Sequence, residues 1–416
     1  MRPSSHSDWT GTKSPMIKTK MSAGIMRRLG HSLRVYFRHP GLLVWVTLIV
    51  MPVSWVHAAE WQLGVAKGAI GGQYSSMRFD EYGNAHICSF SPANGVLSYS
   101  FWDHAADKWF STRIDKGGNF CSLALDSAQH PHISYLFNAG LHYAHWNGNS
   151  WEKQLIPVQA VVIGYNTSIA LDSDGRPAIS FYEEQGMSPD WHRLRMVFWN
   201  GKYWELRTAD AAKGGGKFNS IAIDSSGRPV IAYAPVIYEN ASLRFARWNG
   251  HSWDIEIIEG AKGPAIMYSV GMALDKEDTP HIVYTDVANQ LVKYAVKRNG
   301  KWTTEVIDAL VKVGYPDRNG IALDDQGNVY LSYYDAGSGV LKLAYKRDGK
   351  WVREIVDENY AGFSSCVAVH NGSIWLTYAD ATGEILRYAR RNLPAELSSP
   401  GLLPTANTKS EGETKE

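Results

Sequence analysis

Residues 168–181 read SIALDSDGRPAISF, and this stretch recurs along the chain. Close copies occur at 122–135 (SLALDSAQHPHISY), 220–233 (SIAIDSSGRPVIAY), 271–284 (GMALDKEDTPHIVY) and 320–333 (GIALDDQGNVYLSY), and weaker copies at 76–89 (SMRFDEYGNAHICS) and 366–378 (CVAVHNGSIWLTY). Seven copies of one unit predict a repeat fold, in which each unit buries its apolar faces against its neighbours.

Each unit predicts four short strands. The first has the form SIALD and ends in a turn with Gly or Asp, and the second has the form AISFY. A variable loop leads to a third strand such as LRFARW at 243–248, and an Asn-Gly or Asp-Gly turn leads to a fourth strand that starts at Trp. Four antiparallel strands repeated about every 50 residues are typical of a β-propeller blade. We therefore predict an all-β, seven-bladed β-propeller over residues 59–392.

The tryptophans at the start of the fourth strands predict how the ring closes. Six repeats have one: Trp109, Trp151, Trp204, Trp253, Trp302 and Trp351. The seventh repeat stops at Asn392, but an unassigned strand around Trp61 precedes the first repeat. Pairing that N-terminal strand with blade 7 would leave no long unpaired edge. We interpret all seven tryptophans as structural, because they recur at one position.

Both ends of the chain are expected to lie outside the propeller. The basic stretch 26–40, the apolar stretch 41–55 and Val-His-Ala at 56–58 are typical of a signal peptide, with cleavage after Ala58. Residues 1–58 are therefore an upstream extension and signal peptide, which predicts a periplasmic or secreted protein without stable membrane insertion after cleavage. Residues 393–416 are rich in Pro, Ser, Thr and charge and predict a disordered tail.

Charge and motifs exclude several classes of function. The chain has 42 Lys and Arg and 41 Asp and Glu. Residues 1–58 hold eight of the former and one of the latter, so 34 basic and 40 acidic residues remain. No basic excess is left to neutralise phosphates, and nucleic-acid binding is not expected. No zinc-type or phosphate-loop motif occurs, so we predict no cofactor and no metal, and we expect a monomer.

The turns between the third and fourth strands carry a family resemblance. Asn249, Gly250 and Trp253, like Asp348, Gly349 and Trp351, resemble the Asp-box of sialidase-type repeats, roughly Ser-x-Asp-x-Gly-x-x-Trp, without the leading Ser and with a shorter turn. The repeats are similar to those of secreted bacterial seven-bladed propellers distantly related to sialidases. The resemblance implies the fold but not an activity, since propellers host many functions. Sialidases of this fold need an arginine triad with a Tyr/Glu pair, and no motif assigns one here.

An aromatic residue precedes each predicted first strand. These residues are Tyr74, Phe120, Tyr165, Phe218, Tyr268, Tyr315 and Phe363. In propellers, the connections between blades lie with the second-to-third strand loops on the face that usually carries function. The aromatic residues either surround the channel mouth there or pack between blades. We place Tyr165, Tyr268 and Tyr315 in the candidate ligand site.

Departures from the repeat supply the other candidates. Arg78 stands where other blades have Ala, and it either binds a carboxylate or sulfate or pairs with a nearby Asp. The blade 3 loop YEEQGMSPDWHR contains Trp191 and His192, and blades 4 and 6 add Tyr238 and Arg318. Such a grouping suits a carbohydrate, although a variable loop is often only a loop.

Three further residue sets are interpreted as structural. The Asp residues that end the first strands are expected to form turns by accepting bonds from their own backbone. Second-strand histidines at one repeat position, His86, His132 and His281, are expected to be packing residues. A bridge between Cys88 and Cys121 is conceivable in an oxidising compartment, but the odd count, with Cys366, leaves at least one thiol free, and the sequence does not decide whether a disulfide forms.

Two functions remain in competition. The favoured hypothesis is a binding or scaffold propeller for a glycan or a protein ligand, with no catalytic residues. The alternative is a carbohydrate-active enzyme, a polysaccharide lyase or glycoside hydrolase, that uses His192, Tyr165 or Tyr238 with Arg78 or Arg318. An acid or His, a Tyr and an Arg that converge at the mouth would favour the enzyme.

Overall fold

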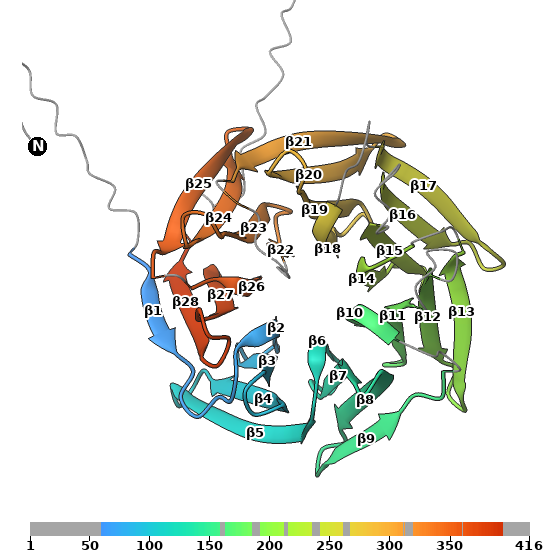
Figure 1. Ribbon diagram of the computed structural model, residues 1–416, viewed down its shortest axis with the longest axis horizontal. Coiled ribbons are helices and arrows are strands. Elements are labelled where there is room, and N and C mark those ends of the chain that lie inside the picture. Colours follow the sequence, from blue (N-terminus) through green and yellow to red (C-terminus); the bar gives the residue numbers. More distant parts are fainter. Residues whose placement is uncertain are drawn as a thin grey trace, which may run out of the picture. The chain divides into compact units, whose positions relative to one another are not determined.

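A computed structural model describes residues 60–158, 163–184, 192–211, 215–234, 242–260, 267–310, 312, 319–359 and 361–393, with the backbone alone at 163–165 and 267. These residues form seven four-stranded antiparallel sheets arranged around a central axis (Figure 1). The predicted all-β, seven-bladed propeller is confirmed.

Each of the first six blades is built from four consecutive strands, with the first innermost and the fourth outermost (Figure 1). Blade 1 comprises β2 (Gln73–Phe79), β3 (Ala85–Ser91), β4 (Val96–Asp103) and β5 (Lys108–Lys116), and blade 2 comprises β6 (Asn119–Leu125), β7 (Pro131–Phe137), β8 (Gly140–Trp146) and β9 (Trp151–Leu155). Blade 3 comprises β10 (Ile163–Leu171), β11 (Pro177–Glu183), β12 (Arg193–Trp199) and β13 (Trp204–Asp210), and blade 4 comprises β14 (Phe218–Ile223), β15 (Pro229–Ala234), β16 (Ser242–Trp248) and β17 (Trp253–Gly260). Blade 5 comprises β18 (Met267–Leu274), β19 (Pro280–Asp286), β20 (Leu291–Arg298) and β21 (Lys301–Ala309), and blade 6 comprises β22 (Gly320–Leu323), β23 (Val329–Asp335), β24 (Val340–Arg347) and β25 (Lys350–Asp357).

Blade 7 is assembled from both ends of the propeller. Its inner strands are β26 (Phe363–His370), β27 (Ser373–Ala379) and β28 (Leu386–Asn392), and its outer strand is β1 (Gln62–Val65). β1 pairs antiparallel with β28, with Gln62 opposite Arg390 and Val65 opposite Arg387. The predicted N-terminal closing strand is therefore confirmed.

The hydrophobic core lies between blades rather than within them. The described residues form seven buried apolar clusters, and each joins two adjacent blades. At the junction of blades 7 and 1, for example, Trp375 and Leu386 pack with Met77 and Trp102. Each blade buries both faces in this way, which explains the long runs of buried residues in the second strands.

The first residue of the repeat also holds neighbouring blades together. The hydroxyl of Ser168 accepts a hydrogen bond from the backbone N–H of Ile221 in the next blade, at 3.2 Å. Ser76 and Ser122 accept equivalent bonds from Leu123 and Ile169. Since this contact recurs, Ser at that position serves the ring.

The Asp turns form as predicted. In all six, one carboxylate oxygen accepts the backbone N–H groups two and four residues on, as Asp172 does from Asp174 and Arg176 at 3.0 and 2.9 Å. The other Asp residues of this kind are Asp80, Asp126, Asp224, Asp275 and Asp324.

The cysteine bridge that the sequence left open is present. Cys88 in β3 and Cys121 in β6 form a disulfide, with Cα atoms 6.4 Å apart. Both side chains are fully buried in the cluster between blades 1 and 2. Adjacent blades bring these two positions together, which the spacing of the cysteines in the sequence does not reveal. Cys366 is the free cysteine of the described residues.

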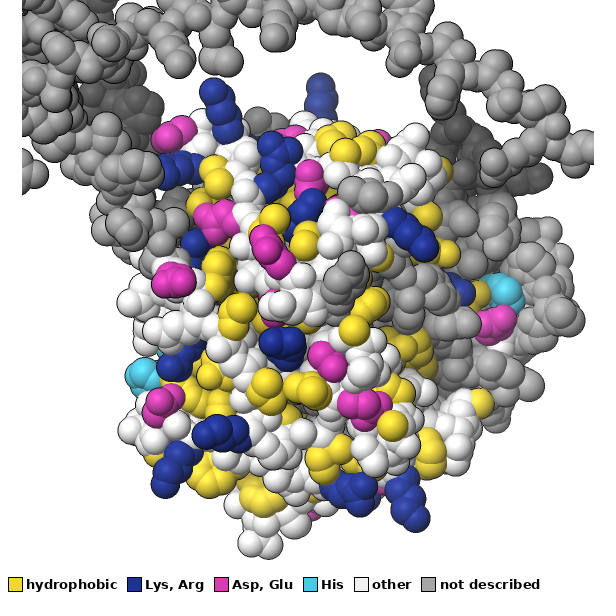
Figure 2. Space-filling view, turned by 60° about the vertical axis from the view of Figure 1, so that its left-hand side comes forward, with side chains coloured by type: hydrophobic (Ala, Val, Ile, Leu, Met, Phe, Trp, Pro, Cys, Tyr) yellow, Lys and Arg dark blue, Asp and Glu magenta, His cyan; other side chains and the backbone are white. Residues whose placement is uncertain are grey.

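We next consider membrane-spanning helices, metal sites and the distribution of surface charge. That part of the chain has no helix long and apolar enough to cross a membrane. Within the same residues, no three His, Cys, Asp or Glu side chains are grouped to hold a metal ion. Lys, Arg, Asp and Glu side chains are interspersed with apolar ones on the side of the molecule seen in Figure 2.

Candidate functional site

The propeller has two faces, which we define by the segments they carry. The turn face carries the first-to-second and third-to-fourth strand turns, such as 172–176 and 200–203 in blade 3. The loop face carries the second-to-third strand loops and the connections between blades, such as 92–95 in blade 1 and 117–118 between blades 1 and 2. Consecutive antiparallel strands place these two sets at opposite ends of each blade.

The candidate residues from the sequence lie on both faces. Trp191, Tyr238, Tyr315 and Arg318 fall outside the described residues, and Tyr165 is described by its backbone in β10 only. His192 lies on the loop face, directly before β12, and Tyr268 lies at the loop-face end of β18. Arg78 lies at the other end of its strand β2, beside the turn face. The structure therefore does not bring Arg78 together with His192 and Tyr268.

Among the described residues, Arg78 forms no ion pair with an Asp, and its binding of a carboxylate or sulfate stays a prediction. It is exposed, and its guanidinium donates a hydrogen bond to the backbone carbonyl of Met77 at 2.7 Å.

The described aromatic residues contact one another across blade junctions. Tyr74 and Phe120 have ring centroids 4.2 Å apart, and Phe218 and Tyr268 have centroids 4.8 Å apart. They lie within the first strands rather than ahead of them, and β-bulges follow Tyr74, Phe120 and Tyr268. Tyr268 packs against the core between blades 4 and 5, which supports the packing interpretation for it.

His192 has polar neighbours on the loop face. Its Nδ1 lies 2.7 Å from the hydroxyl of buried Tyr182, and its Nε2 lies 3.8 Å from a carboxylate oxygen of Glu184. Lys217 lies close enough to interact with Glu184, and burial lowers the pKa of that lysine while Glu184 raises it. An imidazole, a phenol, a carboxylate and an amine are thus placed together, which we name the His192 cluster (Tyr182, Glu184, His192 and Lys217).

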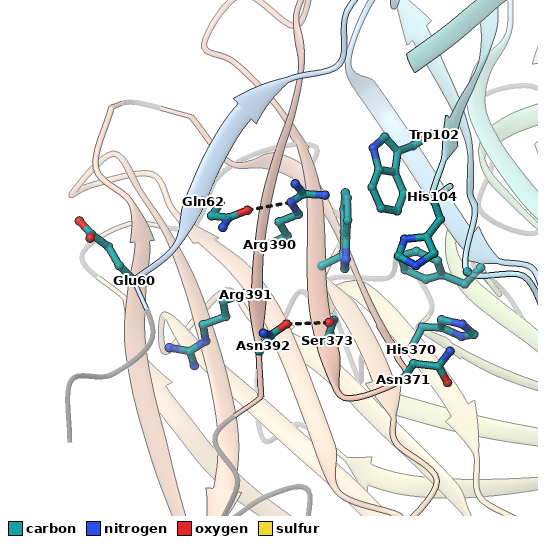
Figure 3. A pocket seen from close by; sticks show the side chains of 13 residues that line it. Glu60, Gln62, Trp102, His104, His370, Asn371, Ser373, Arg390, Arg391 and Asn392 are labelled. Carbon is teal, nitrogen blue, oxygen red and sulfur yellow. Dashed lines mark hydrogen bonds between the residues drawn. The ribbon is translucent and has the colours of Figure 1, made fainter. Parts of the chain in front are cut away.

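The best-defined cavity lies elsewhere, on the turn face at the junction of blades 7 and 1 (Figure 3). It has a volume of about 470 Å³. Blade 7 contributes Arg390 and Asn392 from β28, His370 from the end of β26 and Asn371 from the turn that follows, and blade 1 contributes His104. We name this cavity the 7–1 pocket; its lining is completed by Glu60, Gln62, Phe79, Gly83, Trp102, Ser373, Trp375 and Arg391.

Arg390 is held rigidly in this pocket. Its guanidinium lies 5.2 Å from the ring centroid of Trp102 and 5.0 Å from that of Trp375. Its Nε donates to the Gln62 side chain at 2.9 Å (Figure 3), and Nη1 lies 3.7 Å from Asp107. Both indoles are about 95% buried, so they fix the arginine beside the cavity.

The pocket exists because blade 7 departs from the repeat. His370 replaces the turn-forming Asp, and the first-to-second strand turn shrinks to Asn371 and Gly372, with φ of 46° and 71°. Two residues with positive φ make the tight hairpin that Asn-Gly favours. Space opens on both sides of this short turn, since a second cavity of about 310 Å³ lies toward blade 6.

The charge of the 7–1 pocket is predominantly positive. Arg390, Arg391, His104 and His370 line it, against the single carboxylate of Glu60. Arg391 is paired with Glu354 at 2.7 Å, which leaves Arg390 as the main charge that faces the cavity. Burial lowers the pKa of His370, and within the described part of the chain its buried Nε2 has no hydrogen-bond partner.

Side chains close the corresponding space at other junctions. Between blades 5 and 6, Lys346 contacts both Trp351 and Glu305, and Trp351 donates its indole N–H to the same Glu305 at 2.7 Å. Between blades 3 and 4, the guanidinium of Arg207 lies 4.6 Å above Trp248. These contacts confirm the structural interpretation for Trp351 and show how side chains can fill a junction.

The sequence analysis missed the 7–1 pocket. It directed attention to the loop face and treated the turn face as structural. One signal was available: blade 7 alone has His in place of the turn Asp and a shorter turn. The side chains that fill or leave a junction come from two blades, however, and the repeat pattern does not show how they meet.

The comparisons with known proteins agree with the fold. No protein-family model matches the sequence, and no curated protein matches it. A catalytically inactive virginiamycin B lyase from Staphylococcus aureus, solved with quinupristin, is 12% identical over 80% of this chain and all of that one, with a TM-score of 0.55. A six-bladed propeller lectin of Aleuria aurantia, described for its fucose recognition, is 14% identical over 70% of this chain and 98% of that one, with a TM-score of 0.51.

A polysaccharide lyase, Uly1, is a third similar structure. It is 9% identical, with 82% of this chain and 94% of that chain covered and a TM-score of 0.50. At these identities the likeness is one of fold.

Proposed function

We propose that this chain is an exported glycan-binding propeller whose 7–1 pocket holds an acidic group of a glycan, a carboxylate or a sulfate. The observation that carries the proposal is Arg390, which two buried indoles fix at the floor of an open, mainly positive cavity. A guanidinium fixed in this way loses little entropy when it binds a planar carboxylate or a sulfate.

The other lining groups suit an oxygen-rich ligand. Asn371, Asn392 and Ser373 offer amide and hydroxyl groups at the rim, and His104 offers an exposed imidazole. Such groups exchange hydrogen bonds with sugar hydroxyls. That a lectin and a polysaccharide lyase share the fold is consistent with a carbohydrate ligand.

The test is calorimetric titration with a panel of anionic and neutral polysaccharides. We expect anionic members to bind more tightly and to lose affinity as salt is raised. Arg390→Gln should weaken that binding by about tenfold or more, because a charge-assisted hydrogen bond contributes roughly 1.5–3 kcal/mol. Arg247→Gln is the matched control, since Arg247 occupies the equivalent third-strand position in blade 4. Equal binding by both variants, or no binding of any anionic glycan, would contradict the proposal.

The His192 cluster favours a second candidate function, a carbohydrate-active enzyme with its site on the loop face. His192 and Tyr182 lie within hydrogen-bond distance of each other, as a proton-transfer pair requires. The same polysaccharides should then be tested for new reducing ends and for unsaturated products. Turnover that Tyr182→Phe or His192→Ala abolishes would support the enzyme, and binding without turnover would contradict it.

A further inference from the structure

A second cavity occupies the equivalent place at the junction of blades 2 and 3, and we name it the 2–3 pocket. Its volume is about 550 Å³, and it is lined by His132, Tyr143, His145, Glu152, Lys153, Gln154, Asp174, Gly175, Arg176, Pro177, Trp199 and Trp204. The two pockets correspond position by position. Trp199 occupies the place of Trp102, each opposite the tryptophan that starts its own fourth strand. His145 occupies the place of Arg390 near the end of the third strand.

The two pockets differ in whether a cation covers the third-strand tryptophan. Trp102 is 5% exposed and lies beneath Arg390, and Trp248 at the next junction lies beneath Arg207. Gln154 stands at the repeat position of Arg207, third after the fourth-strand tryptophan. Among the described residues no cation lies over Trp199, which is half-buried and faces the cavity.

Two buried donors at this junction lack acceptors. In the described part of the chain, His145 Nδ1 and Trp204 Nε1 are shielded from solvent and have no hydrogen-bond partner. The equivalent indole nitrogens of Trp302 and Trp351 donate to Glu256 and Glu305, but Gln154, at the corresponding place in blade 2, is exposed and makes no such bond. The indole nitrogen of Trp253 at the next junction is also buried without a partner among the described residues, so it is the uncovered face of Trp199 that distinguishes the 2–3 junction.

The charges around the 2–3 pocket are balanced. Arg176 bonds to Asp172 at 2.8 Å and to Asp174 at 2.9 Å, and Lys153 lies 3.3 Å from Asp115. His132 bonds to Tyr143 at 2.6 Å, and burial lowers the pKa of this histidine. Arg176 and Lys153 are therefore ion-paired, and among the described residues neither is held against buried indoles as Arg390 is.

We infer that the 2–3 pocket is a second ligand site, which binds an uncharged sugar ring stacked on Trp199. An indole face suits the C–H groups of a pyranose, and the carboxylates and amide around it suit the hydroxyls. The inference rests on the proposed function in so far as both ligands are carbohydrates. Two pockets of different chemistry on one face let the protein bind two points of one heteropolysaccharide, and linked binding raises overall affinity without new contacts.

The test separates the two pockets by ligand and by variant. The probes are neutral cello-, xylo- and manno-oligosaccharides, titrated calorimetrically into the full chain. At least one of these oligosaccharides should bind, and Trp199→Ala should weaken its binding roughly tenfold. Trp248→Ala is the control and should leave the binding unchanged, because Arg207 covers Trp248. Gln154→Arg should also weaken it, because it rebuilds the cover that Arg207 provides in the next junction, and this exposed substitution is not expected to disturb folding.

The outcomes distinguish this inference from the proposed function. Arg390→Gln should leave the neutral ligand unaffected, and Gln154→Arg should leave the anionic ligand unaffected. Binding of a neutral oligosaccharide that survives both Trp199→Ala and Gln154→Arg overturns the second site, as does the absence of any neutral binder. If the parent protein binds no anionic glycan, that result would instead count against the 7–1 pocket alone.

Discussion

At the scale of single residues, three buried histidines show how an apparent catalytic triad can be structural. His86, His132 and His281 each contact the turn Asp through Nε2 and a third-strand Tyr hydroxyl through Nδ1. In blade 5, His281 Nε2 lies 3.2 Å from a carboxylate oxygen of Asp275, and His281 Nδ1 lies 2.5 Å from the hydroxyl of Tyr294. The arrangement recurs in blades 1, 2 and 5, so it serves the blades, and the histidines are hydrogen-bonded rather than only packed.

Because of these histidines, we expect the protein to be less stable in weak acid. Burial lowers the pKa of all three, so the folded state resists protonation while the unfolded chain takes up protons near its ordinary value of about 6.5. The free energy of unfolding should therefore fall as the pH drops from 8 to 5. Urea titrations at several pH values measure this.

A matched variant tests the cause. Blade 6 has Tyr330 in place of the histidine, and its hydroxyl bonds Asp324 at 3.1 Å. His281→Tyr should fold and lose less stability between pH 8 and pH 5 than the parent. An unchanged pH profile would show that His281 does not contribute.

A second contact allows us to predict how much stability is lost when one buried hydroxyl is removed. Tyr378 donates to Asp357 in the preceding blade at 2.7 Å, and Asp357 is only 2% exposed. Tyr378→Phe should lower the free energy of unfolding by about 1–3 kcal/mol, because a buried acceptor loses its donor. Tyr203→Phe is the control, since Tyr203 is 56% exposed, and it should leave the urea midpoint unchanged. Equal effects of the two substitutions would refute the explanation.

At the scale of elements, the ring depends on one short strand. β1 supplies the outer edge of blade 7, and its neighbours Trp61 and Ala66 pack into the clusters on either side of that blade. Without β1, the edge of β28 is unpaired and both clusters are partly exposed.

Deletion of this strand should destabilise the whole propeller. A chain without residues 59–66 should melt at a lower temperature than the same chain with them, and hydrogen exchange should increase first in β28. Differential scanning calorimetry and exchange measurements provide the comparison. A truncated chain that melts like its parent would show that closure by β1 contributes little.

At the scale of the whole molecule, the disulfide joins blades 1 and 2 close to the point of closure. Reduction, or replacement of Cys88 and Cys121 by Ala, should lower the free energy of unfolding by about 2–4 kcal/mol, since the bridge restricts the unfolded chain. Cys366→Ala is the control, because Cys366 is the free cysteine of the described residues. If reduction leaves the melting temperature unchanged, the bridge does not stabilise the ring. A bridge that forms in the folded protein would be consistent with the proposed export to an oxidising compartment.

The repeat pattern predicts the fold far better than it predicts a site. SIALD-type strands, Asp turns and a displaced strand at Trp61 are local or repeated features, and the structure confirms each of them. The pockets depend instead on which side chains meet between blades, such as Arg207 over Trp248 and Gln154 beside an uncovered Trp199. Those side chains belong to strands about 40 residues or more apart in the sequence, so no short sequence pattern encodes their contacts. The sequence also left the pairing of Cys88 and Cys121 open, because nothing in it shows that the two side chains meet between blades.

The closure of blade 7 also determines when folding can finish. Gln62 and Arg390, which bond across β1 and β28, are 328 residues apart in the chain. During synthesis β1 emerges early and waits until nearly the whole propeller has been made before its partner exists. Blades 1 to 6 can form in order from local hairpins, but the ring closes last, in a step that joins the most distant segments. Until that moment the chain is an open arc with unprotected edges, and in that interval it is most vulnerable to aggregation and proteolysis.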